Sequence, residues 1–280
     1  MKLDVAIPCH NDCLDAEKLL DSLVEQKRRP DGALIIHNGC TARNDALPVA
    51  NKAMAVNHAA SVLHGDYMVC LDADITLSPY FLAAIETAIL RDNLEAGAGL
   101  VLVKDKKGQW RGSGSAMLFY NGAAVFAKRD LLLEHPIPTD CVVEDTDYLL
   151  FLQKSKRRVQ LVPDAVAYEE PAHRSALLDL RREIRYQQGG LQLLLKRRCY
   201  RFGVSTLGYA IATGGLYAVV IWLLAQNAWQ LATILYLVLF LSCATKFSGL
   251  GVRNVWVMGL AGPLVPFVAI AACLLRKRVW

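Results

Sequence analysis

The 280-residue sequence contains long stretches without a single charged side chain, and these stretches lie in one part of the chain. No Asp, Glu, Lys or Arg occurs between Arg201 and Lys246 or between Arg253 and Arg276, whereas the composition before Arg201 is that of an ordinary globular domain. The overall hydrophobic fraction of 54% is also high for a soluble domain. We therefore expect a soluble front part and a membrane-embedded back part.

Several other signals are missing. The opening MKLDVAIPCHND has too short an apolar run for a signal peptide, and the eight cysteines form no C-x-x-C pair. These absences predict a cytoplasmic front domain without a disulfide framework or zinc site. There is no P-loop and no nucleic-acid-binding signature, so no nucleic-acid partner is expected. The basic residues cluster at 181–201 and 276–278, which favours contact with anionic membrane lipids.

Short apolar strands alternate with amphipathic helical patterns in the front part. The expected strands are 3–9, 32–38, 66–72 and 96–104, and the expected helices are 13–26, 46–65 and 78–92. This alternation predicts an α/β fold with a Rossmann-like, mostly parallel sheet. Because ligands bind beyond the carboxyl ends of the strands in such sheets, polar residues at those ends are candidate site residues.

Two carboxylates, Asp72 and Asp74, follow the strand expected at 66–72. A D-x-D pair at a strand end can hold a hard divalent cation through oxygen and leave positions for diphosphate oxygens and water. The alternative is a solvated turn that happens to contain two acids.

A second acidic cluster, Glu144, Asp145 and Asp147, precedes an amphipathic helical pattern. Acids at a helix start are ordinarily capping and dipole residues. The functional interpretation needs one of them to face a pocket as a general base.

The third candidate is RREIRY, in which Arg182 and Arg185 share a helix face beside Tyr186. Two guanidinium groups can clamp a diphosphate, and an aromatic ring can pack on a base or a sugar. The alternative is a basic amphipathic helix that rests on lipid.

In this order the motifs resemble the family 2 glycosyltransferases, in the membrane-bound branch that includes cellulose, chitin and hyaluronan synthases and ceramide glucosyltransferase. The resemblance covers about residues 3–200 and is carried by VAIPCHND, NKAMAVNHA, GDYMVCLDAD, NGAAVFAKRDLL, VVEDTDYLLFLQ, VPDAVAYEEP and RREIRY. It implies a nucleotide-sugar domain of the GT-A type and an inverting, metal-dependent sugar transfer.

The resemblance also implies roles on the donor side. Pro8 and Asn38 would lie near the nucleotide base, and Lys52 would approach the nucleotide. Asp72 would contact the nucleoside side, and Asp74 would bind Mg²⁺ or Mn²⁺ on the diphosphate.

On the acceptor side, the resemblance makes Asp145 the base that takes the proton of the acceptor hydroxyl. Glu144 beside it would contact substrate. Arg182 and Arg185 would offset the charge that develops on the leaving diphosphate, with Tyr186 as an aromatic platform.

We expect residues 1–175 to form the cytoplasmic glycosyltransferase domain, 176–203 an interfacial helix and 204–280 a membrane domain. Two apolar spans are expected at 207–225 and 228–245, joined by QNA. A third apolar segment, 254–275, is either a kinked span or a re-entrant hairpin, because the basic residues on both sides of it favour the same face of the membrane.

The expected activity is transfer of a sugar, from a donor expected to be a UDP-sugar, to a lipid or glycan at the cytoplasmic membrane face. Two or three spans are few for a polymer channel in one monomer, which favours short products or a homo-oligomer. A single-addition lipid glycosyltransferase is one rival. Another is a catalytically silent membrane adaptor that keeps the nucleotide-sugar fold.

Overall fold

The computed structural model describes residues 1–9, 13–37, 51–104, 109–112, 122–141, 143–169 and 176–197, together with short helical pieces between 211 and 237. The chain divides into two compact units, 1–171 and 172–280. The predicted boundaries at 175 and 203 stay predictions.

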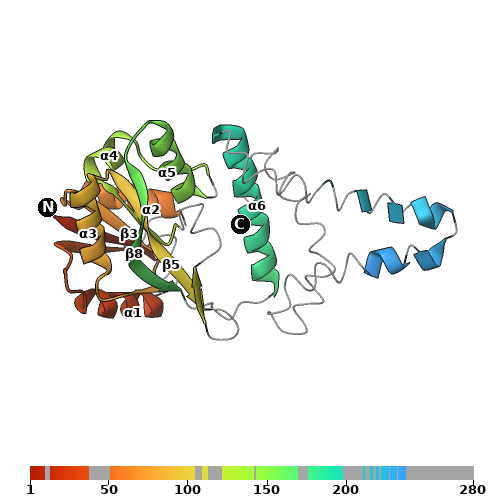
Figure 1. Ribbon diagram of the computed structural model, residues 1–280, viewed down its shortest axis with the longest axis horizontal. Coiled ribbons are helices and arrows are strands. Elements are labelled where there is room, and N and C mark those ends of the chain that lie inside the picture. Colours follow the sequence, from red (N-terminus) through yellow and green to blue (C-terminus); the bar gives the residue numbers. More distant parts are fainter. Residues whose placement is uncertain are drawn as a thin grey trace. The chain divides into compact units, whose positions relative to one another are not determined.

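The first unit is built on one mixed sheet (Figure 1). Its strands are arranged in the order β2-β1-β3-β7-β5-β8-β4. The short strand β6 is not part of this order and pairs with β5. The bounds are β1 Leu3–Cys9, β2 Gly32–His37, β3 Tyr67–Leu71, β4 Ile75–Leu77, β5 Ala96–Lys104, β6 Trp110–Gly112, β7 Ala124–Lys128 and β8 Val159–Glu169.

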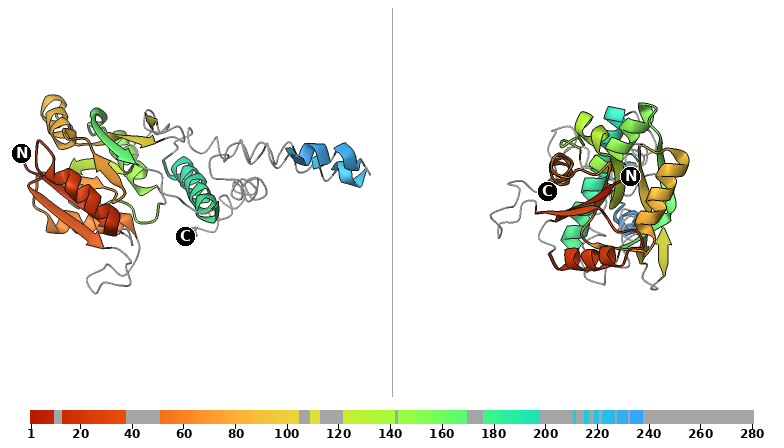
Figure 2. Two further views of the ribbon diagram at one scale, coloured as in Figure 1. Left: turned by 90° about the horizontal axis from the view of Figure 1, so that it is seen from below. Right: turned by 90° about the vertical axis from the view of Figure 1, so that its left-hand side faces the viewer.

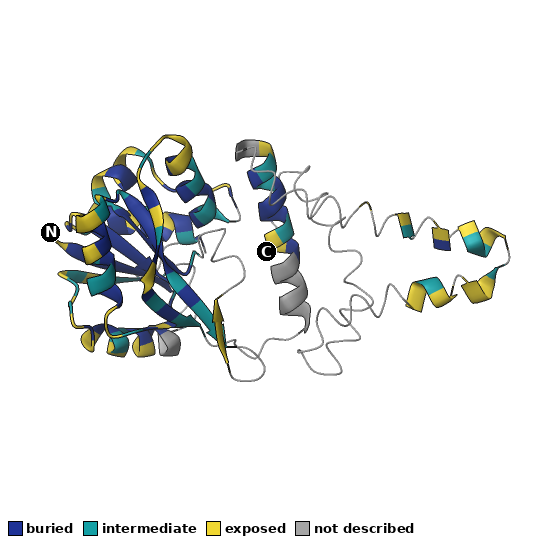
Figure 3. Ribbon diagram, in the orientation of Figure 1, coloured by how far each residue is buried: buried dark blue, intermediate teal, exposed yellow. Residues whose placement is uncertain are grey.

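Helices cover both faces of this sheet (Figure 2). Side chains of α1 and α3 pack into the core on one face, and side chains of α2, α4 and α5 pack into the core on the other. The bounds are α1 Cys13–Val24, α2 Lys52–Val62, α3 Phe81–Asp92, α4 Arg129–Glu134 and α5 Glu144–Lys154. Burial follows this layering, since the central strands β1, β3 and β7 are buried, whereas the short strand β6 is exposed along its whole length (Figure 3).

The prediction of an α/β Rossmann-like sheet is confirmed, but the prediction that it is mostly parallel is wrong. β1 pairs in parallel with β2 and β3, and β5 pairs in parallel with β8. β7 runs antiparallel to both β3 and β5 and lies between them, and β4 and β6 are also antiparallel to their neighbours. β7 begins beside the carboxyl end of β3, where Ala124 pairs with Leu71, and it therefore runs back along β3 in the opposite direction.

Two helices begin later than expected. Asn51 has an extended backbone and caps α2, so this helix starts at Lys52 and not at residue 46. α3 starts at Phe81 because the Ser78 N–H is bonded to the Val166 carbonyl, 2.9 Å away, which holds Ser78 outside the helix.

The second unit contains α6, Ala176–Arg197, in which side chains are described for 184–195. Among the residues that the structure describes, no helix combines the length and the apolar character needed to cross a bilayer. Only separate pieces of the spans predicted at 207–225 and 228–245 are among the described residues, and the segment 254–275 lies wholly outside them.

Candidate active site

The D-x-D acids lie where β3 ends. β3 stops at Leu71, and Asp72, Ala73 and Asp74 form the turn that leads into β4. Ala73 is buried, whereas the two flanking acids are partly exposed. The N–H of Asp72 donates to the carbonyl of Ala123, 2.9 Å away, just before the antiparallel strand β7. This bond fixes the position of the turn just beyond the carboxyl end of β3.

The second acidic cluster lies in the first turn of α5 and not ahead of it. α5 begins at Glu144, and Asp145 and Asp147 are buried in the same turn while Glu144 is partly exposed. The helix dipole favours negative charge at this end. Asp145 lies close to the end of β3, because the same lysine contacts both Asp145 and Asp72.

That lysine is Lys52, the first residue of α2. Its Nζ lies 2.5 Å from Asp72 Oδ1 and 3.0 Å from Asp145 Oδ2, and it donates to the carbonyl of Gly122 over 2.7 Å. We call Lys52, Asp72, Asp145 and the Gly122 carbonyl the lysine cluster. It joins four parts of the chain that are distant in sequence: α2, the turn after β3, the segment before β7, and α5.

The electrostatics of the lysine cluster follow from burial and charge. Burial lowers the pKa of Lys52, but the charges of Asp145 and Asp72 outweigh it and hold this pKa well above its usual value. Burial raises the pKa of Asp145, and the Asp72 charge adds to this rise, while Lys52 opposes it. Two carboxylates and one ammonium leave the cluster with an excess of negative charge. A cationic or metal-bound ligand is therefore favoured beside it.

A glycine is required where the Asp145 carboxylate meets the backbone. A Cβ built on Gly122 would overlap the Asp145 carboxylate, with its Cγ only 2.8 Å away. Sequence reasoning missed this residue, although NG before an apolar strand was a visible signal.

Two asparagines that were also missed attach α2 to the segment before α5. Asn51 Nδ2 donates to the Thr139 carbonyl over 3.2 Å. Asn57 and Ile137 exchange two hydrogen bonds, Nδ2 to the Ile137 carbonyl at 3.0 Å and the Ile137 N–H to Oδ1 at 2.9 Å. Their signal in the sequence is the spacing N-K-x-x-x-x-N.

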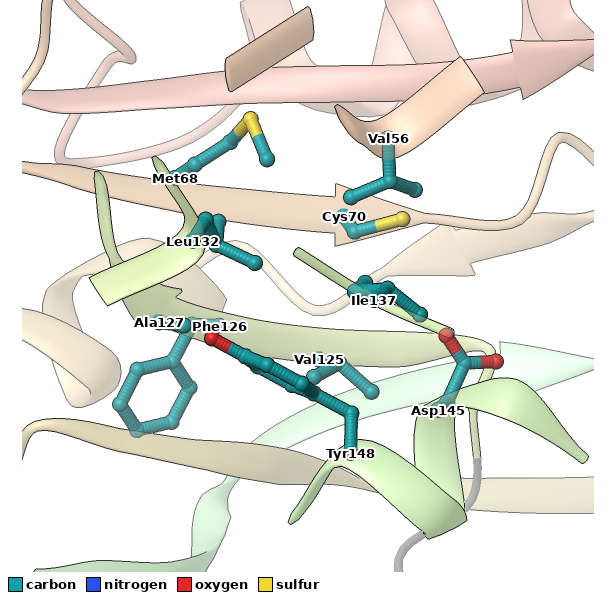
Figure 4. A pocket seen from close by; sticks show the side chains of 10 residues that line it. All are labelled: Val56, Met68, Cys70, Val125, Phe126, Ala127, Leu132, Ile137, Asp145 and Tyr148. Atoms are coloured by element: carbon teal, nitrogen blue, oxygen red, sulfur yellow. The ribbon is translucent and has the colours of Figure 1, made fainter. Parts of the chain in front are cut away.

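A small apolar cavity is lined by Asp145, a member of the lysine cluster, together with nine other residues (Figure 4). Asp145 borders it at one end together with Cys70, and Tyr148, one turn along α5, directs its hydroxyl away from Asp145. The Tyr148 hydroxyl is buried and has no hydrogen-bond partner in the part of the chain that the structure describes. The cavity leaves the Asp145 carboxylate with an apolar side and a charged side.

The other predicted site residues are spread over both units. Pro8 is buried in β1, whereas Asn38 lies outside the described residues. Arg185 and Tyr186 are exposed on α6 in the second unit, and the side chain of Arg182 is outside the described part. The structure thus brings Lys52, Asp72 and Asp145 together. The remaining predicted roles stay predictions.

The residues present fit a hard divalent cation if the ligand supplies the rest of the coordination. In the described ranges no group of three or more His, Cys, Asp and Glu side chains is arranged to hold a metal. Asp74 supplies a carboxylate at the partly exposed turn. Mg²⁺ is commonly held by one or two carboxylates together with phosphate oxygens and water, which matches this set of donors.

The sequence matches no protein-family model and has no significant match among curated proteins. Solved structures, however, match over nearly the whole chain. The mannosyltransferase PcManGT from Pyrobaculum calidifontis, in complex with GDP-Man and Mn²⁺, is 19% identical with a TM-score of 0.58, and the match covers 98% of this chain and 87% of PcManGT. The fold is that of nucleotide-sugar glycosyltransferases.

Two further structures agree on this glycosyltransferase fold. S. aureus TarS 1-349 in complex with UDP-GlcNAc is 15% identical with a TM-score of 0.52, covering 99% of this chain and 90% of TarS 1-349. Glucosyl-3-phosphoglycerate synthase from Mycobacterium tuberculosis, with Mn²⁺, UDP-Glc and phosphoglyceric acid, is 18% identical with a TM-score of 0.53 and covers 69% of this chain and 78% of the synthase. At these identities the likeness establishes the fold alone.

Proposed function

We propose that this protein is an inverting glycosyltransferase that moves a sugar from a nucleotide-sugar to an acceptor hydroxyl. The observation that carries the proposal is the lysine cluster, which places a buried carboxylate, Asp145, beside the acid pair at the end of β3. The glycosyltransferase fold and the neighbours that hold Mn²⁺ with GDP-Man or UDP-Glc support the same assignment.

In the proposed reaction the acceptor oxygen attacks the anomeric carbon on the face opposite the diphosphate. Asp145 takes the hydroxyl proton as the new C–O bond forms, and the electron pair of the breaking bond goes to the diphosphate oxygen. A positioned base of this kind typically contributes about 10²–10⁴-fold to the rate. Inversion follows because the attack and the departure occur on opposite faces.

Asp74 would hold Mg²⁺ or Mn²⁺, which when bound would offset the negative charge on the diphosphate. Asp72 and Lys52 would border the donor, with Pro8 and Asn38 toward the base. The leaving diphosphate would be clamped by Arg182 and Arg185, with Tyr186 beside them. Glu144 would contact the substrate.

We further propose that residues 204–280 anchor the enzyme in a membrane, with its catalytic domain in the cytoplasm and a lipid or glycan acceptor. Residues 202–245 contain no charged side chain. In the helical pieces described there, large apolar side chains including Trp222, Trp229 and Leu237 are exposed. Full-length protein should therefore remain in the pellet after an alkaline carbonate wash of membranes. Its release into the supernatant would contradict the anchor.

The activity is tested by release of nucleoside diphosphate from a panel of nucleotide-sugars, with full-length protein in detergent, Mn²⁺ or Mg²⁺ and membrane lipid extract as acceptor. Release from one donor should be lost in Asp74→Ala and retained in Asp164→Ala, which removes an exposed carboxylate on β8. Asp145→Asn should lower the transfer rate by about 10²–10⁴-fold and leave donor binding intact. Donor binding without release by the wild type would instead indicate a catalytically silent adaptor.

A further inference from the structure

The ammonium of Lys52 is surrounded by three oxygen atoms of the protein in the arrangement that the structure holds. Lys52 Nζ donates hydrogen bonds to Asp145 Oδ2 and to the Gly122 carbonyl, over 3.0 and 2.7 Å, and forms an ion pair with Asp72 Oδ1. The donor diphosphate would have to compete with these partners for the ammonium. The contacts with Asp145 and Gly122 therefore suggest a role of Lys52 beyond that of bordering the donor.

We propose that Lys52 is a positioning residue for the transfer step, which holds the Asp145 carboxylate ionised and in place against Gly122. This inference rests on the proposed glycosyltransferase function and adds a residue that acts through the base. Lys52 touches neither the acceptor nor the reacting carbon in this scheme, so its contribution passes through Asp145.

The charges around Asp145 explain why such a partner is needed. Asp72, from the turn after β3, and Glu144, from the same helix, are both negative, and the neighbouring Cys70 on β3 is a buried thiol. Lys52 is the cation that contacts Asp145 among the described residues. Without it, the buried carboxylate loses this cationic partner and keeps the negative Asp72 nearby, and such a carboxylate takes up a proton more readily. A protonated Asp145 cannot accept the proton of the acceptor hydroxyl.

The attachment of α2 supports a positioning role, because a lysine can fix a carboxylate only if its own backbone is held. Asn51 and Asn57 bond to the backbone of Thr139 and Ile137, in the segment that leads into α5. The helix that carries Lys52 and the chain that carries Asp145 are thus joined by three hydrogen bonds between two pairs of residues. Movement of one relative to the other is restricted by these bonds.

The kinetic test compares wild type, Lys52→Met and the matched control Lys154→Met, which removes an exposed lysine on α5. In Lys52→Met we expect the dissociation constant for the donor to change less than about twofold. We expect kcat to fall by about tenfold or more, with the roughly 10²–10⁴-fold contribution of a positioned base as the upper limit. The acid limb of the kcat–pH profile should move upward by about 1–3 pH units. A large loss of donor affinity with an unchanged acid limb would overturn the proposal and assign Lys52 to donor binding.

A second measurement does not depend on activity. Thermal melts of Lys52→Met, Asp145→Asn and the double variant should show the double variant melting above Lys52→Met, since Asp145→Asn removes the carboxylate that has lost its partner. If Lys52→Met does not fold but the double variant does, the coupling is also supported. Additive losses, or failure of both to fold, would overturn it. A wild type without any transferase activity would refute the proposed function, while these melts would still decide the pairing.

Discussion

Gly122→Ala is expected to displace the Asp145 carboxylate and slow sugar transfer while the domain stays folded. A Cβ at residue 122 would lie 2.8 Å from Asp145 Cγ, and ordinary contacts begin at 3.4 Å, so the carboxylate must retreat by at least the difference, about 0.6 Å. The contact between Lys52 Nζ and Asp145 Oδ2, now 3.0 Å, is expected to weaken as the carboxylate moves. Because a misplacement of about 1 Å can cost about 10²-fold, we expect kcat to fall by roughly 10- to 100-fold.

The assay is steady-state release of nucleoside diphosphate from the preferred donor, with donor affinity measured separately by calorimetry. Gly112→Ala on β6 is the matched control, because its Cβ would meet only Leu100 Cδ1 at 4.0 Å. If Gly122 acts through the carboxylate, adding Gly122→Ala to Asp145→Asn should produce no further loss. Wild-type kcat in Gly122→Ala, or a full additional loss in the double variant, would refute the reasoning.

Three further predictions concern stability. Tyr148→Phe removes a buried hydroxyl without a described partner, so calorimetry should find the melting temperature unchanged or raised; a loss of about 1–3 kcal/mol would reveal a partner. Asn57→Ala removes both bonds to Ile137 and should lower the unfolding free energy by about 1–3 kcal/mol in urea titrations, whereas an unchanged midpoint would mean that these bonds contribute nothing. Burial raises the pKa of the Glu95 carboxyl, but hydrogen bonds from Arg158 and Arg157 outweigh burial and hold this pKa below its usual value of 4.5. Its contribution is therefore present above that pH and lost as pH falls below it, so melts of Glu95→Gln should converge with wild type in acid; a gap independent of pH would contradict this.

Much of the first unit could be predicted from the sequence because its signals are local. The strand at 66–72 and the helix at 13–26 follow from hydrophobic spacing, and Asp72 and Asp145 were found because acids beside apolar elements are conspicuous. The antiparallel β7 was not predicted, because spacing identifies a strand but does not give its direction. The late start of α2 depends on the cap at Asn51, which competes with the helical pattern upstream.

The lysine cluster could not be assembled from the sequence for a different reason. Its members are separated by up to 93 positions, and the bond from Lys52 to Asp145 depends on a glycine that has no side chain to signal its role. Periodicity and motif spacing describe neighbours along the chain. Contacts across the sheet appear only once strand order and register are known.

The reversed strand β7 makes the register of one ladder a determinant of the chemistry. Leu71 pairs with Ala124 at the end of the β3–β7 ladder, so Gly122 reaches Asp145 only if this pairing is kept. A slip of two residues would preserve which side chains face the core but carry Gly122 about 7 Å along the strand. Insertions in the connection before residue 121 should be tolerated, since the ladder holds the residues of β7 in register.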